Sequence, residues 1–90
     1  MRPSTISDFA FQGCTGLTSL TIPESVTYIG KYAFSGCEKI KNITIPESVT
    51  SIGDSAFFEC KSLESIKLPS AVKVIEYHTF FQCNNLYLKM

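Results

Sequence analysis

The sequence predicts a solenoid: a single domain in which short parallel strands stack coil upon coil. Two observations carry this prediction. One motif returns every 23 residues along the 90-residue chain, and each copy contains a short alternation of apolar and polar residues. One copy is too short to bury its own apolar side chains, so neighbouring copies must stack and share a core. We therefore expect about four coils that form one domain over residues 1–90.

The repeat is visible at several positions that hold the same kind of residue. One unit reads A-F-x-x-C-x-x-L-x-x-I-x-I-P-x-x-V-x-x-I-G. A period of roughly 20–29 residues with this spacing of apolar residues is typical of a leucine-rich repeat. We divide the chain into a partial unit, 1–16, three full units, 17–39, 40–62 and 63–85, and a degenerate end, 86–90. The clearest repeated positions are Phe11, Phe34, Phe57 and Phe80, then Cys14, Cys37, Cys60 and Cys83, and then Pro23, Pro46 and Pro69.

The first element of each unit is a short strand. Ile43 and Ile45 flank Thr44, which is the alternation of a half-buried strand, and a proline then removes the N–H that would continue the ladder. Stacked strands should form a parallel sheet. We call their outward residues the polar strand face and expect it to bind a protein, although it could serve only for solubility. The polar strand face consists of Ser19, Thr21, Asn42, Thr44, Ser65 and Lys67.

The second half of each unit returns the chain along the other side of the coil. We expect Gly30 and Gly53 to take a backbone conformation that other residues resist. The segment 33–37 is too short for a full helix, so we expect a single helical or 3₁₀ turn with Phe34 in the core. The result is a right-handed coil of short parallel strands joined by short helical or 3₁₀ turns. A parallel β-helix is the alternative, and the poor alternation of 33–37 argues against it.

The complete motif resembles the BspA-like class of leucine-rich repeats. The matching segments are 33–37 (A-F-S-G-C), 40–46 (I-K-N-I-T-I-P) and 49–53 (V-T-S-I-G), and the resemblance extends from about Ile6 to Leu86. It implies a non-catalytic module for protein binding or adhesion, on the cell surface or secreted as part of a larger protein. A purely structural repeat spacer is the alternative function.

The last unit departs from the motif. Glu76 stands where Gly30 and Gly53 stand in the earlier units, Thr79 replaces an alanine, and Lys89 falls where Ile66 should face the core. We therefore expect the fourth repeat to be degenerate, as a terminal repeat would be.

Composition and motifs argue against several functions. Eight basic and eight acidic residues give a net charge of zero, so no basic surface is expected to grip nucleic acid. No apolar run is long enough to span a membrane, and the first residues do not read as a signal peptide. No phosphate loop, nucleophile motif or other cofactor motif is present, and the single histidine, His78, is expected at the surface. We expect no catalytic residues and no cofactor.

The four cysteines recur at the same position of each unit. Zinc sites use pairs of cysteines two to four residues apart, which this chain lacks. Equivalent side chains on stacked coils point the same way, which suits disulfides poorly. We therefore expect four buried free thiols and no metal site.

Two features predict that the chain associates with itself. The ends of the solenoid have no polar cap, so strand edges and core should be exposed there. Phe58 and Phe81 occupy one position of successive units, where their rings should stack on the surface, and Tyr77 could extend this aromatic patch. The alternative is that both phenylalanines fold inward as additional core.

Overall fold

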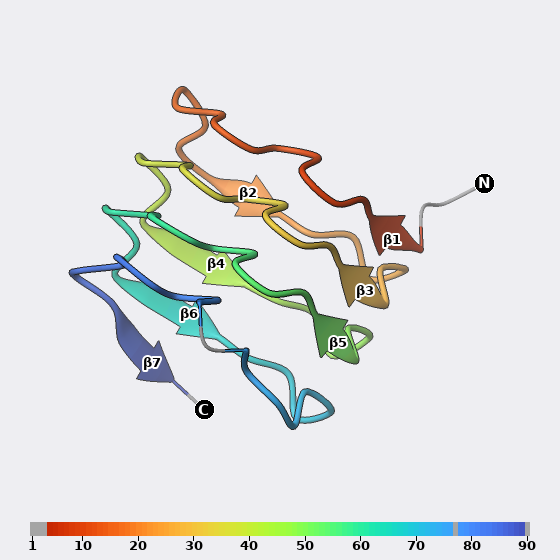
Figure 1. Cartoon of the computed structure of the whole chain (residues 1–90). Helices are drawn as coiled ribbons and strands as arrows, with labels where there is room; N and C mark the ends of the chain where they lie inside the picture. Colours follow the sequence, from red (N-terminus) through yellow and green to blue (C-terminus); the bar gives the residue numbers. More distant parts are fainter. Residues whose placement is uncertain (1–3, 77, 90) are drawn as a thin grey trace.

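The chain folds into a solenoid of stacked coils whose strands all pair in parallel (Figure 1). The computed structural model describes residues 4–76 and 78–89, and within them no helix is long and apolar enough to cross a membrane. The strands in this part of the chain are β1 (Thr5–Ile6), β2 (Leu20–Thr21), β3 (Tyr28–Ile29), β4 (Asn42–Thr44), β5 (Ser51–Ile52), β6 (Ser65–Lys67) and β7 (Tyr87–Lys89).

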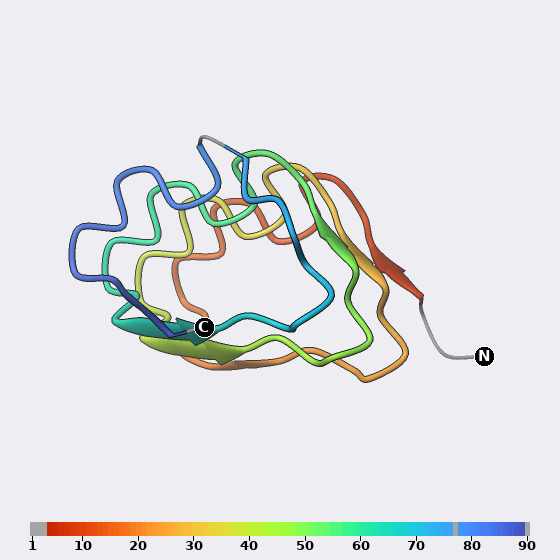
Figure 2. The ribbon, with the colours of Figure 1, turned by 90° about the horizontal axis from the view of Figure 1, so that it is seen from below.

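The strands form two sheets on different sides of the coil (Figure 2). Sheet B has the order β2-β4-β6-β7 and contains the strands that the alternation of residues predicts. Sheet A has the order β1-β3-β5 and lies in the return half of the first three units, where the sequence predicted no strands. The solenoid prediction is confirmed, and each of the first three coils holds a short strand in its return half that was not predicted.

The register of sheet B follows the repeat until its last strand. Ile43 lies opposite Leu20 and Ile66, each 23 residues away. In β7, however, Leu88 rather than Lys89 lies opposite Ile66, so the expectation that Lys89 takes this position is wrong. A slip of one residue brings a leucine into the apolar register, because placing a lysine there would cost the desolvation of its charge.

A ladder of phenylalanine rings fills the core of the coils. Phe11, Phe34, Phe57 and Phe80 stack with ring centroids 5.3, 5.4 and 5.6 Å apart. The two middle rings are fully buried. The spacing of the rings follows that of neighbouring parallel strands, so one residue per unit supplies a continuous core.

The segment around Phe34 forms hydrogen-bonded turns, and the predicted helical or 3₁₀ turn is wrong. Cys37 N–H donates to the carbonyl of Phe34 within the turn (3.2 Å), whereas Phe34 N–H donates to Ala56 of the next coil (2.7 Å). Positive φ angles at Tyr32 (57°) and Gly36 (75°) further interrupt helical geometry. Donors that alternate between the turn and the next coil cannot maintain the hydrogen bonds of a helix.

Gly30 and Gly53 are required for a different reason from the predicted one. Neither has a positive φ angle; the glycines that do are Gly13 and Gly36. A Cβ at Gly30 would lie 2.5 Å from the backbone nitrogen of Asp8, and a Cβ at Gly53 would lie 2.6 Å from that of Lys31. Glycine is therefore needed because neighbouring coils approach closely at this position.

Candidate binding surfaces

The polar strand face lies on the outer side of sheet B, as the alternation predicts. Ser65 is half-buried and the other five members are exposed. The hydroxyl of Ser65 donates to Asn42 Oδ1 of the neighbouring strand at 2.5 Å. Thr21, Asn42 and Thr44 contribute to a shallow hollow of about 420 Å³. These hydroxyl and amide groups could donate and accept hydrogen bonds along an extended ligand.

A second surface lies across the coil from sheet B, on the turn segments (Figure 2). The rings of Phe58 and Phe81 stack there with centroids 5.7 Å apart and planes within 8°. Phe81 is 41% exposed and Phe58 is half-buried, so the predicted aromatic patch forms and the inward alternative is wrong for Phe81. Tyr77, the third predicted member, lies outside the described residues.

The aromatic surface extends further along the solenoid than the sequence suggested. Phe9 stacks on Tyr32 with centroids 5.2 Å apart, and Tyr32 meets Phe58 edge-on at 6.4 Å. The imidazole of His78 lies edge-on to Phe81 at 5.4 Å. We name this continuous row the aromatic stripe, and it reaches all four coils. The aromatic stripe consists of Phe9, Tyr32, Phe58, His78 and Phe81.

The sequence signal for the first half of the aromatic stripe was present but incomplete. Phe9 and Tyr32 occupy one position of the repeat, whereas Phe58 and Phe81 occupy another. Ser55 takes the Phe9 position in the third coil and is buried. With a small residue there, the row of rings passes diagonally from Tyr32 to Phe58. This crossing between two repeat positions depends on packing and cannot be read from the period alone.

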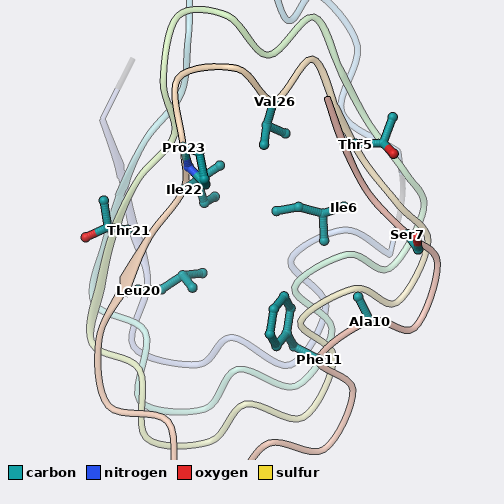
Figure 3. Close-up of a pocket in the computed structure, with 10 residues that line it drawn as sticks. All are labelled: Thr5, Ile6, Ser7, Ala10, Phe11, Leu20, Thr21, Ile22, Pro23 and Val26. Atoms are coloured by element: carbon teal, nitrogen blue, oxygen red, sulfur yellow. The ribbon is translucent and has the colours of Figure 1, made fainter. Parts of the chain in front are cut away.

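The first coil ends in an apolar hollow of about 340 Å³ (Figure 3). Ile6, Phe11 and Leu20 are directed into the interior of the coil, with Ile22 and Val26 beside them. Phe11 is partly exposed, unlike Phe34 and Phe57 deeper in the ladder. Among the described residues, no coil packs against this side of the first coil.

The cysteines form a second ladder parallel to the phenylalanines. The thiols of Cys37, Cys60 and Cys83 donate to the carbonyls of Phe11, Phe34 and Phe57 at 3.3, 3.1 and 3.0 Å. Cys37 and Cys60 are buried, but Cys14 and Cys83 are only partly covered, so the expectation of four buried thiols is wrong for the end coils.

The environment of each cysteine sets its acidity. Burial raises the pKa of the Cys37 thiol. The neighbouring Cys83 thiol and burial raise the pKa of Cys60, and the neighbouring Cys60 thiol lowers the pKa of Cys83. Among the described residues, no group of three or more His, Cys, Asp or Glu side chains could hold a metal ion. The ladder is an arrangement of packed thiols bonded to backbone carbonyls.

Known proteins share this architecture. The family model of BspA-type leucine-rich repeat regions, which contains six copies, matches residues 4–88. No curated protein sequence is significantly similar to the chain.

Several solved structures of bacterial proteins are similar to the chain. A leucine-rich repeat protein of T. pallidum is 36% identical with a TM-score of 0.90, and the match covers 93% of this chain and 39% of that protein. One from Bacteroides ovatus is 33% identical with a TM-score of 0.87, covering 91% of this chain and 21% of that one. A leucine-rich cell surface protein of Faecalibacterium prausnitzii is 32% identical with a TM-score of 0.73, and the match covers 94% of this chain and 28% of that protein. The chain thus spans well under half of these three relatives.

Proposed function

Because the chain belongs to the BspA-type leucine-rich repeat family, we propose that it is a non-catalytic, protein-binding or adhesive module of a cell-surface protein. The observation that carries the proposal is the aromatic stripe. Phe9 and Phe81, at its two ends, are 54% and 41% exposed. Contiguous apolar surface of this kind marks interaction sites, and aromatic side chains dominate the energy of protein interfaces. The cell-surface description of one relative supports the location.

The polar strand face is the second surface that a protein ligand could use. Its exposed side chains are polar, and all except Lys67 are small and uncharged, which suits hydrogen bonding at the rim of an interface more than apolar anchoring. We therefore place the anchoring contacts of the ligand on the aromatic stripe, and the polar strand face is tested beside it.

Capture of proteins from an extract of host cells or extracellular matrix tests the proposal. The immobilised chain is compared with two variants, Phe9→Ser with Phe81→Ser, and Thr21→Glu with Thr44→Glu. We expect a protein that the wild type retains to be lost with the first variant and kept with the second. Loss only with the second variant would move the site to the polar strand face. Equal retention by all three would place the site on neither surface, and no retention by the wild type would favour a structural spacer.

We also propose that the isolated chain associates with itself, through the aromatic stripe or the uncovered first coil. Light scattering of the wild type and of a Phe58→Ser, Phe81→Ser variant separates these surfaces. Association of the wild type alone would assign the contact to the aromatic stripe, and association of both would assign it to the open coil. A wild type that stays monomeric at high concentration would contradict the proposal.

A further inference from the structure

Among residues 4–76 and 78–89, no strand neighbours the outer edge of β5, although the fourth coil continues past it. Residues 73–76 run inside the outline that β1, β3 and β5 trace (Figure 2). The fourth coil regains backbone contact immediately afterwards, since Phe57 N–H donates to Thr79 O at 3.0 Å, and β7 pairs with β6. The open edge is therefore a local gap in an otherwise stacked coil.

The pairing of β3 on β1 shows what such an edge binds. Three N–H groups donate from the second coil to the first: Thr27 to Ser4 O (2.7 Å), Gly30 to Ile6 O (2.8 Å) and Lys31 to the Asp8 carboxylate (2.9 Å). Two of the acceptors are backbone carbonyls, and the third is the side chain that follows the strand. Together they define a three-point acceptor pattern along one strand edge.

The outer edge of β5 repeats this acceptor pattern without the donors. The matching acceptors are the carbonyl oxygens of Thr50 and Ile52 and the carboxylate of Asp54. Within residues 4–76 and 78–89, none of these three acceptors has a hydrogen-bond donor. Strand edges with unpaired backbone groups are templates for another strand.

A hollow of about 540 Å³ lies beside this edge. Ile52, Gly53 and Asp54 line one part of it, and Glu76 and His78 line the other, with Tyr28, Lys31 and Ser51 completing the wall. Two carboxylates, one ammonium group and one imidazole therefore face the hollow. The two carboxylates outnumber the one ammonium group, which favours a cationic side chain in the ligand.

We propose that the outer edge of β5 binds an extended segment of a partner protein in which a glycine precedes a lysine or arginine. The glycine is required because a Cβ at the equivalent Gly30 would lie 2.5 Å from the Asp8 backbone nitrogen. The backbone N–H of the basic residue donates to Asp54, as Lys31 donates to Asp8. Its side chain lies in the negatively charged hollow. The ligand thus resembles the segment that follows β3 in this chain.

A synthetic peptide that copies residues 25–31, with both ends blocked, tests this site on the whole chain. Titration into isotope-labelled protein should shift the amide resonances of residues 50–54 and 76 in nuclear magnetic resonance spectra. The same peptide with Gly30→Val should bind at least about tenfold more weakly. Equal affinity for the two peptides, or shifts concentrated elsewhere, would overturn the proposal.

One exposed carboxylate provides the matched control in the protein. Asp54→Asn should lower the affinity for the copied peptide about threefold or more. Glu38→Gln makes an equal change of charge away from β5 and should leave the affinity unchanged. An unchanged affinity in Asp54→Asn would overturn the site. The proposal depends on the proposed function only because its ligand is a protein segment. Peptide binding at β5 does not involve the aromatic stripe. The capture experiment can therefore fail while the peptide still binds, and the two failures can be distinguished.

Discussion

Residues 46–53 and 69–76 occupy the same position in successive coils, yet only the first segment extends sheet A. Residues 51–52 form β5 and pair with β3. Residues 74–75 form no strand, although β6 comes before them in the chain and β7, which comes after them, pairs with β6. The comparison teaches that apolar residues at the right positions are insufficient for the second sheet, because Ile75 stands in the register of Ile52.

Side-chain hydroxyls distinguish the two segments. In the third coil, Ser48 Oγ donates to the carbonyl of Val26 at 2.7 Å, and Thr50 Oγ1 donates to that of Thr27 at 3.3 Å. The equivalent residues in the fourth coil are Ala71 and Lys73. Neither can make these bonds, so two links between neighbouring coils are missing.

The glycine completes the difference. Gly53 lets its N–H reach the carbonyl of Ile29 at 2.7 Å, and Glu76 takes this position in the fourth coil. A Cβ there would meet the backbone of the third coil, so the chain lies further inward and leaves the outer edge of β5 unpaired. Ile52 is consequently 5% exposed, whereas Ile75 is 38% exposed and Val74 66%.

The largest expected effect is the contrast between Ile52→Ala and Ile75→Ala. Ile52 is buried in the core, so its truncation should cost about 2–4 kcal/mol of unfolding free energy. Ile75 is partly exposed, so its truncation should cost less than about 1 kcal/mol. Urea denaturation of the two variants measures both values. Equal costs would mean that the fourth coil packs as tightly as the third.

A valine at Gly53 should make the third coil behave like the fourth. Its Cβ would lie 2.6 Å from the Lys31 nitrogen and 2.8 Å from the Gly30 carbonyl carbon, so Gly53→Val should cost about 2–3 kcal/mol through a forced backbone shift. Gly16→Val is the control, because nothing lies within 4 Å of a Cβ there. The same denaturation experiment measures both, and similar losses would remove close approach as the explanation.

Restoring the three missing features should extend sheet A. The variant Ala71→Ser, Lys73→Thr, Glu76→Gly regains both hydroxyls and the close approach, and we expect a gain of about 1–2 kcal/mol. Hydrogen exchange should show new protection of the amides at positions 73 and 76. Ala71→Ser alone restores one bond and should leave the amide at 76 unprotected. No new protection in the triple variant would show that other interactions hold the fourth coil inward.

The sequence predicted the parts of the fold that repeat with strong local patterns. Alternating residues around Ile43 identify the strands of sheet B, and the period of 23 aligns the phenylalanine ladder. The strands of sheet A are two residues long, too short for alternation to be visible. The predicted helical turn is wrong because carbonyl oxygens of the next coil accept hydrogen bonds from half of the N–H groups in this segment. Local helix propensity carries no information about these contacts between coils.

The candidate surfaces divide in the same way. The polar strand face follows directly from the alternation, and the Phe58–Phe81 stack follows from the repeat. The rest of the aromatic stripe requires the diagonal contact between Tyr32 and Phe58, and the open edge of β5 requires an inward path of the chain. Both arise where a unit departs from the motif, so they depend on packing between coils.

The smallest expected effect concerns the hydrogen bonds with which Ser70, in the fourth coil, still contacts Glu47 in the third coil. Ser70 donates to the Glu47 carboxylate through its N–H (3.1 Å) and its hydroxyl (2.9 Å). These hydrogen bonds lower the pKa of Glu47 below its ordinary value of 4.5. The folded state therefore favours the ionised carboxylate, and the resulting stability is present above pH 4.5 and lost as the pH falls through the lowered pKa.

Urea denaturation at pH 6 and at pH 3 tests this contribution. We expect the urea midpoint to decrease from pH 6 to pH 3, and to decrease less in Glu47→Gln than in the wild type. Glu24→Gln is the matched control, because Glu24 occupies the same position one coil earlier but has Glu47, and not a serine, 23 residues further along the chain. It should keep the pH dependence of the wild type. Suppose instead that both variants lose the same part of the pH dependence of the urea midpoint. The hydrogen bonds between Glu47 and Ser70 would then contribute nothing specific, and they could not be what holds residue 70 of the fourth coil against the third coil.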